Sequence, residues 1–219
     1  MIKGISKESL SKKTYLEVIE VLIKAIEKRD PFTAGHQRRV AFLSKAIAEE
    51  IGLPKKQVEG VYLGALIHDI GKLYVPAEIL ANPKKLTATE FEMIKLHVKA
   101  GYDIIKEVGF PWKASAEMVL QHHERLDGSG YPQGLKGDEI CICARILAVA
   151  DTVEAMSIAR PYINNASLEL ALEEIEKGKG TLYDPLIVNA CIKLFKEKNY
   201  KFKGKDVSEN TRHHKQGEK

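Results

Sequence analysis

The chain has 219 residues, of which 44% are hydrophobic and 29% charged, so it can bury the core of one ordinary domain or two small ones. No uncharged stretch approaches the roughly 20 apolar residues that a membrane-spanning helix needs. The first residues also lack the apolar run of a signal peptide. These features exclude a wholly disordered chain and predict a cytoplasmic protein without a membrane span.

The charged residues are unevenly distributed along the chain. The formal net charge is +4, but from Lys193 onward nine Lys and Arg stand against four Asp and Glu. Residues 1–192 therefore carry 25 basic and 26 acidic side chains, and no stripe of basic and aromatic residues predicts binding to DNA or RNA. The three cysteines, Cys141, Cys143 and Cys191, show no CxxC spacing, so neither a disulfide framework nor a zinc knuckle is predicted.

Helical periodicity covers almost the whole chain, beginning with apolar residues at three- and four-residue steps from Tyr15 to Ile26. This pattern predicts a helix over 14–29 that ends before Pro31, because the residue preceding a proline is disfavoured in the helical conformation. Further helices are predicted from Thr33 to about 51, from Pro54 to Gly71, from Thr87 through Ile105, and over 113–123, 140–156, 167–177 and 185–195.

Capping motifs mark where some of these helices begin. Thr87 followed three residues later by Glu90 is a capping-box signature, and Asp184 is a typical N-cap residue. No segment shows a sustained period of two, so the predicted fold class is all-α. The predicted organisation is an N-terminal amphipathic helix over 1–29, one domain over 30–198, and a polar, flexible tail over 199–219.

The placement of the seven histidines is the most informative feature of the sequence. Five of them lie in or at the end of predicted helices, and several of the faces involved are otherwise apolar and point to the core. Burying such groups without partners costs about 1 to 3 kcal/mol each, so they need a common partner. Imidazole and carboxylate ligands without thiolate suit Zn, Mn, Fe or Ni. The residues concerned are His36, His68, His97, His122, His123 and Asp151.

Two pairs of candidate ligands are adjacent in sequence. Neighbours on a helix point about 100° apart, so one ion would not readily use both members of His68–Asp69 or of His122–His123. Two neighbouring ions would accept both pairs, and mixed sets of this kind commonly hold two ions with a carboxylate between them. The pattern therefore predicts a binuclear centre in which Asp69 bridges the ions.

Two motifs resemble those of the HD-GYP family of metal-dependent cyclic di-GMP phosphodiesterases: HDIGK at 68–72 and HHERLDGSGYP at 122–132. A bare HD pair is weak evidence, whereas the eleven-residue signature that follows in the correct order is highly specific. The resemblance covers about residues 28–195 and extends through DPFTAGHQRRV at 30–40, RILAVAD at 145–151, Arg160-Pro161-Tyr162 and Tyr183-Asp184-Pro185.

The resemblance implies a helical HD-domain bundle with a metal centre at its middle, holding iron or manganese. Members of the family with three metals add a glutamate four residues before the first ligand histidine. Phe32 occupies that position here, and a phenyl ring cannot coordinate, so we expect two metal ions. The implied ligands are His36, His68, Asp69, His97, His122, His123 and Asp151.

The resemblance and the residue chemistry also indicate candidates for catalysis and substrate binding. We expect Lys72 to hold a phosphate oxygen, and Asp127 to assist proton transfer or orient a ligand histidine. Tyr131 is expected either to stack on or hydrogen-bond to a nucleotide. The alternative is that it packs its glycine-rich loop onto the bundle. Arg160 is expected to grip a phosphate or a guanine edge. The predicted catalytic residues are Asp69, Lys72 and Asp127, and the predicted substrate-binding residues are Lys72, Gly130, Tyr131 and Arg160.

The favoured function is hydrolysis of cyclic di-GMP to linear pGpG, and onward to GMP, by a metal-activated water attacking phosphorus in line. A phosphodiesterase for another cyclic dinucleotide, such as cyclic GMP-AMP, is a second hypothesis. Departures from the family pattern at Glu154 and at 157–159 favour it, although neither departure is expected to touch the ligands. A non-catalytic dinucleotide-binding or protein-interaction module is the third hypothesis.

The N-terminal helix carries apolar residues on more than one face, namely Leu16, Val21 and Ile23 besides its inward set. This pattern is compatible with a homodimer or with a regulatory partner such as a diguanylate cyclase. Packing of the helix on its own bundle is the alternative and the favoured one.

Overall fold

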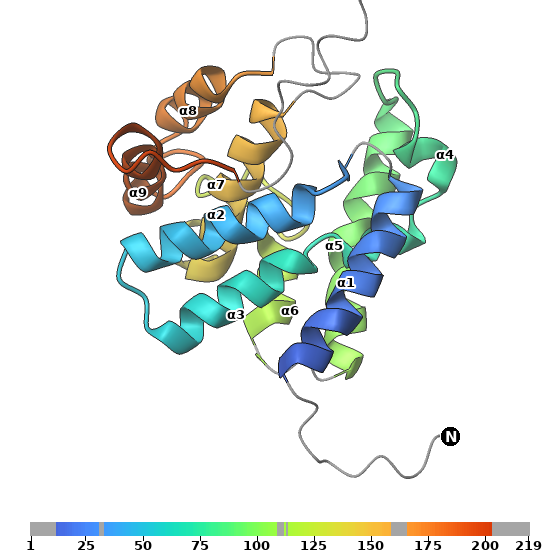
Figure 1. Ribbon diagram of the computed structural model, residues 1–219. Coiled ribbons are helices and arrows are strands. Elements are labelled where there is room, and N and C mark those ends of the chain that lie inside the picture. Colours follow the sequence, from blue (N-terminus) through green and yellow to red (C-terminus); the bar gives the residue numbers. More distant parts are fainter. Residues whose placement is uncertain (1–11, 31–32, 109–111, 113, 159–165, 203–219) are drawn as a thin grey trace, which may run out of the picture.

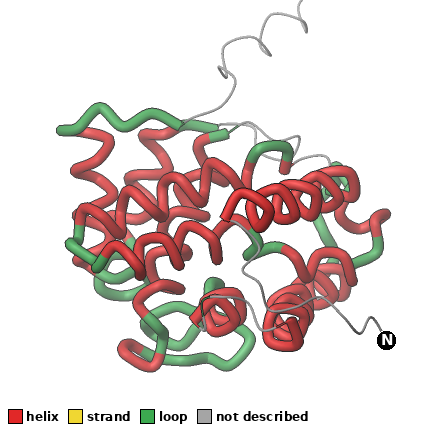
Figure 2. The backbone as a smooth tube through the Cα atoms, turned by 60° about the horizontal axis from the view of Figure 1, so that its bottom comes forward, coloured by secondary structure: helices red, strands yellow, loops and turns green. Residues whose placement is uncertain are grey.

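The computed structural model describes residues 12–30, 33–108, 112, 114–158 and 166–202 (Figure 1). Within these residues the chain forms α-helices and short 3-10 segments without any strand, which confirms the predicted all-α class (Figure 2). The elements are α1 (Lys12–Arg29), α2 (His36–Glu50), α3 (Lys55–Leu66), η2 (Ile70–Tyr74), α4 (Ala77–Leu80), α5 (Ala88–Val108), α6 (Ala114–Gln121), η3 (Gly137–Glu139), α7 (Ile142–Ser157), α8 (Leu168–Lys177) and α9 (Pro185–Lys196).

The helices pack around α2 and α7. In Figure 1, α2 and α3 lie side by side, α7 passes next to α2, and α8 and α9 lie together at one end of the bundle. At the other end η2 lies in contact with both α1 and α5. Apolar side chains from α1, α2, α3, α7 and α9 form one hydrophobic cluster, so the predicted inward faces meet in a common core.

The predicted helix starts at Thr87 and Asp184 are confirmed because they depend on local chemistry. The Thr87 N–H donates to the Glu90 carboxylate at 2.7 Å, while the Glu90 N–H donates to the Thr87 hydroxyl at 3.3 Å. The Asp184 carboxylate accepts from the Leu186 N–H at 2.9 Å. Each contact satisfies an N–H group that has no partner inside its helix.

Two predicted helix ends are wrong. The sequence predicted helices up to Gly71 and His123, whereas α3 ends at Leu66 and α6 ends at Gln121. In each turn that follows, the Nδ1–H group of a histidine donates to the carbonyl three residues earlier, as His97 also does inside α5, so this bond alone does not end a helix. His68 takes the carbonyl of Ala65 and His122 takes that of Val119, both at 2.7 Å.

The domain boundaries at 29/30 and 198/199 stay predictions. Ile19, Ile23 and Ile26 of α1 belong to the same core cluster as α2 and α7, so this helix packs on its own bundle. At the other end, Tyr200 and Phe202 lie against Phe195, with ring centroids 5.2 and 5.6 Å apart. The rest of the predicted tail lies outside the described residues. Among the described helices, none has both the length and the apolar character needed to cross a bilayer.

Candidate metal centre

The structure brings the predicted metal ligands together from three helices and two turns. His36 is the first residue of α2, His97 lies in the middle of α5, and Asp151 lies in α7. The two adjacent pairs occupy the turns that follow α3 and α6, not helices as predicted. Most of these side chains are buried, while His123 and Asp151 are partly exposed. The full set is His36, His68, Asp69, His97, His122, His123 and Asp151.

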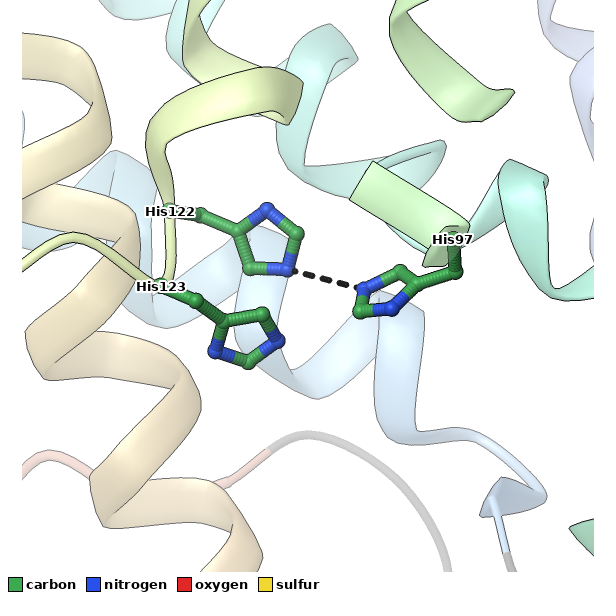
Figure 3. Close-up of side chains that lie close together, drawn as sticks. All are labelled: His97, His122 and His123. Atoms are coloured by element: carbon green, nitrogen blue, oxygen red, sulfur yellow. Dashed lines mark hydrogen bonds between the residues drawn. The ribbon is translucent and has the colours of Figure 1, made fainter. Parts of the chain in front are cut away.

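The ligands form two groups, each with its donor atoms within 4.8 Å of one another. The first group contains His36, His68 and Asp69, and the second contains His97, His122 and His123. Figure 3 shows the three rings of the second group facing a common point. This division into two groups agrees with the pattern from which a binuclear centre was predicted.

Asp69 lies between the two groups. Its Oδ2 atom is 3.5 Å from His68 Nε2 and 3.8 Å from His36 Nε2, whereas its Oδ1 atom is 3.5 Å from His97 Nε2. One carboxylate oxygen thus faces each group. Asp151 adds a further oxygen to the first group, with Oδ1 3.2 Å from His36 Nε2 and 4.0 Å from His68 Nε2.

Backbone carbonyls fix the orientation of three rings. The Nδ1–H groups of His68, His97 and His122 each donate, at 2.7 Å, to the carbonyl three residues earlier. A carbonyl oxygen can only accept, so Nδ1 carries the proton in each ring. The Nε2 lone pairs are therefore directed into the cluster, which is the tautomer that a metal ligand requires.

His36 is oriented by a carboxylate. Its Nδ1 atom makes a short contact with Glu154, which is fully buried and also accepts from Arg39 Nε at 2.7 Å and Nη2 at 2.6 Å. The expectation that the departure at Glu154 touches none of the ligands is therefore wrong. Glu154 lies three residues after Asp151, so one turn of α7 carries both groups on the same face. That spacing is the signal that sequence analysis missed.

Burial and charge set the protonation of the cluster. Burial lowers the pKa of His97, His122 and His123, the last to about 3, so these rings are neutral at ordinary pH. Burial would lower the pKa of His36 too, but the carboxylates of Glu154 and Asp151 raise it to about 9. Although burial opposes ionisation, Lys72 and the surrounding imidazoles hold the pKa of Asp69 well below its usual range.

These residues fit divalent cations. His97 Nε2 and His122 Nε2 face each other at 3.4 Å, as the dashed line in Figure 3 marks. Because both rings are neutral with their protons on Nδ1, the two facing atoms are both acceptors and repel each other. A cation between them would remove that repulsion. Nitrogen and carboxylate donors without thiolate suit first-row transition metals.

A cavity of about 960 Å³ opens beside the cluster. Lys72 lines it, with its Nζ atom 2.9 Å from Asp69 Oδ2 and 3.2 Å from Asp30 Oδ2. The neighbouring Gly71 lets η2 lie against α5, because a Cβ atom at that position would lie 1.9 Å from the carbonyl oxygen of His97. The cavity therefore places an ammonium group next to the predicted bridging carboxylate.

The glycine-rich loop lies against the second histidine group. Tyr131 lines the cavity and stacks on His123, with ring centroids 4.7 Å apart and an interplanar angle of 27°. Its backbone N–H donates to the carbonyl of His123 at 3.2 Å. A Cβ atom on Gly130 would lie 2.5 Å from that same carbonyl oxygen, so only glycine fits there. Tyr131 thus packs the loop onto a candidate ligand while keeping contact with the cavity.

The structure does not bring Asp127 to the cluster. Asp127 is exposed, its carboxylate accepts from the Ser129 N–H at 2.9 Å, and it is not among the described residues that line the cavity. Sequence analysis instead missed Glu124, a buried residue whose carboxylate accepts from the N–H groups of Gln133 at 2.7 Å and Leu135 at 3.1 Å. Its position directly after the two histidines was the available signal. Phe32 and Arg160, for which the sequence also predicted roles, lie outside the described residues.

Comparison with known proteins agrees with this site. A cyclic di-GMP phosphodiesterase of Thermotoga maritima is 47% identical over 83% of this chain and 50% of its own length. A cyclic di-GMP phosphodiesterase response regulator of Xanthomonas campestris is 37% identical over 81% of this chain and 47% of its own length. A 3'3'-cGAMP-specific phosphodiesterase of Vibrio cholerae is 37% identical over 78% of this chain and 37% of its own length. The chain thus spans half or less of the length of these relatives.

Solved structures and a family model give the fold and the family. An HDG"Y"P protein from Bdellovibrio bacteriovorus superposes with a TM-score of 0.65 at 17% identity, covering 84% of this chain and 64% of its own. A cyclic GMP-AMP-specific phosphodiesterase of Vibrio cholerae superposes with a TM-score of 0.67 at 18% identity, covering 89% of this chain and 52% of its own. The HD domain model matches residues 20–187. Since this match includes most of the chain and both predicted ligand pairs, the chain belongs to the HD domain family.

Proposed function

We propose that this chain is a metal-dependent phosphodiesterase that hydrolyses cyclic di-GMP to linear pGpG, with GMP as a further product. The observation that carries the proposal is the position of Asp69, whose two oxygens face two separate histidine groups beside a large cavity. Relatives named as cyclic di-GMP phosphodiesterases support the choice of substrate.

We propose that the centre holds two divalent ions, iron or manganese, as the sequence resemblance implied. When bound, two such ions supply a water with a lowered pKa and stabilise the charge that develops at phosphorus. Asp69 would belong to both sites, and the remaining ligands divide as His36, His68 and Asp151 for one site and His97, His122 and His123 for the other.

The chain's own groups account for binding and orientation of the substrate. Lys72 projects its ammonium group into the cavity beside Asp69, where it would hold a non-bridging phosphate oxygen. Glu154 keeps the His36 ring in one orientation, and Tyr131 closes the wall next to His123. The roles of Asp127 and Arg160 stay predictions from the sequence.

Hydrolysis of 3'3'-cyclic GMP-AMP is a second candidate function. A relative named for that activity is 37% identical to this chain, as is the Xanthomonas relative named for cyclic di-GMP. Direct competition between the two dinucleotides separates the candidates. The dinucleotide that the enzyme prefers should inhibit turnover of the other one at a lower concentration than the reverse pairing requires.

Product analysis tests the proposal. Protein purified anaerobically and reloaded separately with iron and manganese is incubated with cyclic di-GMP, and the nucleotides formed are identified. Wild type should release pGpG or GMP only with metal, whereas Asp69→Ala should release neither. Asp103→Ala is the matched control, since Asp103 is a carboxylate of α5 that pairs with Lys99 at the surface and is absent from the cavity wall. Wild type that binds two metals per chain and hydrolyses neither dinucleotide would overturn the proposal.

Other expectations from the sequence also await tests. The homodimer, a diguanylate cyclase partner, a cytoplasmic location and the absence of DNA or RNA binding all stay predictions. Sedimentation of the metal-loaded protein over a range of concentrations addresses the first of them directly.

A further inference from the structure

The cavity extends well beyond the metal centre. Its far wall is made by the segment that joins α4 to α5 and by the first turn of α5, including Lys84, Lys85 and Phe91. Pockets for whole small-molecule ligands measure roughly 300 to 1,000 Å³. The volume of about 960 Å³ therefore has room for a ligand much larger than the one phosphodiester group that the metal centre would engage.

Phe91 is the unusual residue of this wall. Its side chain is 45% exposed although it is large and apolar, and it is not among the described residues of the hydrophobic core cluster. It lines the cavity, where its ring lies edge-on to Tyr131 with centroids 6.4 Å apart. Lys95 supports both rings, with Nζ 5.0 Å from the Phe91 centroid and 5.4 Å from the Tyr131 centroid.

The aromatic side chains form a row that leads away from the candidate metal ligands. His123 stacks on Tyr131, and Tyr131 contacts Phe91, so the row begins at a candidate ligand and ends at a partly exposed ring. The Tyr131 ring is already engaged by His123. Phe91 is 45% exposed and therefore offers the more open aromatic surface of the two.

We propose that Phe91 is a stacking platform for the purine base of the nucleotide that is not being cleaved, and that Lys84 and Lys85 hold the phosphate of that nucleotide. This inference rests on the proposed function. Each nucleobase has a flat π face that stacks on aromatic side chains, and Lys ammonium groups bind phosphate oxygens as point charges. The two exposed lysines line the same cavity as Phe91 and precede it by only six and seven residues, so one nucleotide would contact both features.

The position of this subsite predicts its kinetic effect. A contact with the uncleaved nucleotide is made equally in the ground state and in the transition state, so it lowers KM without changing kcat. A substrate that lacks the second nucleotide gains nothing from the contact. A structural role of Phe91 would instead affect every substrate and the metal content together.

The test compares Phe91→Ala and Phe91→Tyr with Leu96→Ala in the metal-loaded protein. Leu96 is the matched control because it is a 62% exposed apolar residue of the same helix and is not part of the cavity wall. KM and kcat are measured for cyclic di-GMP and for methyl p-nitrophenyl phosphate, and bound metal is measured for each variant. Phe91→Ala should raise KM for cyclic di-GMP on the order of tenfold, as expected for loss of one stacked base.

The other measurements should stay at wild-type values. These are kcat, turnover of methyl p-nitrophenyl phosphate, metal content, and all the constants of Phe91→Tyr and Leu96→Ala. Lys84→Ala combined with Lys85→Ala should also raise KM for cyclic di-GMP and weaken its dependence on salt.

An unchanged KM in Phe91→Ala would overturn the subsite while leaving the phosphodiesterase intact, because wild type still cleaves the dinucleotide. Equal losses on both substrates, or loss of metal, would also overturn it and assign Phe91 a structural role. If wild type cleaves methyl p-nitrophenyl phosphate but neither cyclic dinucleotide, the proposed function itself fails, which is a distinct result.

Discussion

His68, His97 and His122 obtain their orientation from their own helical turns, since each ring donates to the carbonyl three residues earlier. His36 cannot do the same. It is the first residue of α2, so no helical turn of α2 precedes it to supply a carbonyl. Glu154 from α7 takes over that function, which explains why a fully buried carboxylate is kept beside the cluster.

Glu154→Gln therefore tests how the first ligand is positioned. Glutamine has nearly the same shape but loses the negative charge that holds both His36 and Arg39. Metal affinity should fall about 10- to 100-fold, the usual effect of removing a group that orients a ligand. Competition with a chelator measures the affinity, and Glu173→Gln, at an exposed position of α8, is the control. Wild-type affinity in Glu154→Gln would refute a positioning role.

Single residues differed in how far the sequence could predict them. The candidate ligands were found because their motifs and helical faces are local features of the sequence. Glu154 and Glu124 were missed because their roles arise from contacts with His36 and with a loop, which depend on the packing of distant segments. No role was predicted for Phe91 for the same reason, since the cavity it lines exists only in the fold.

Among the elements, the two helix starts marked by capping motifs were predicted correctly, whereas the ends of α3 and α6 were not. The caps at Thr87 and Asp184 need only residues within the same turn, so the sequence is sufficient to find them. The ends of α3 and α6 have no comparable local signal, because the turns that follow them carry candidate ligands whose neighbours in the cluster come from other helices. The short segments η2, η3 and α4 have too few residues to show a period.

The contact between η2 and α5 is a second feature that the sequence concealed. Gly71 was interpreted as a helix stop, yet it lies where the two backbones approach most closely. A Cβ atom there would lie 1.9 Å from the His97 carbonyl oxygen and 2.5 Å from the Gly101 nitrogen. The position of Gly71 thus sets the distance between Asp69 on one side and His97 on the other.

Gly71→Ala should consequently push η2 away from α5. The free energy of unfolding should fall by about 1 to 3 kcal/mol or more from overpacking, and metal affinity should fall with it. Gly52→Ala is the control, because it has a φ of 80° but its Cβ would meet nothing within 4 Å, so it carries backbone strain without a clash. Urea unfolding and chelator competition measure the two effects. Unchanged metal affinity in Gly71→Ala would contradict this account.

For the whole molecule, the cluster connects helices that are distant in sequence. Its ligands come from α2, from the turns after α3 and α6, and from α5 and α7. Helical periodicity predicted which face of each helix turns inward, but it does not determine which inward faces meet. The family motifs supplied that information for the ligands. The motifs did not reveal that the connection between α4 and α5 lines the cavity beside the ligands.

Removing the metal should therefore destabilise the whole bundle and not only the site. Without cations, the facing nitrogens of His97 and His122 and the ionised carboxylate of Asp69 stay buried without their proposed partner. Each ion at a free concentration 100 times its Kd should stabilise the fold by about 2.7 kcal/mol, which corresponds to a rise in the unfolding midpoint of roughly 5 to 10 °C for one filled site and about twice that for two. Calorimetry with chelated and reloaded protein measures the shift, which Asp69→Ala should lack. Equal midpoints for chelated and reloaded wild type would show that no metal binds preferentially to the folded chain.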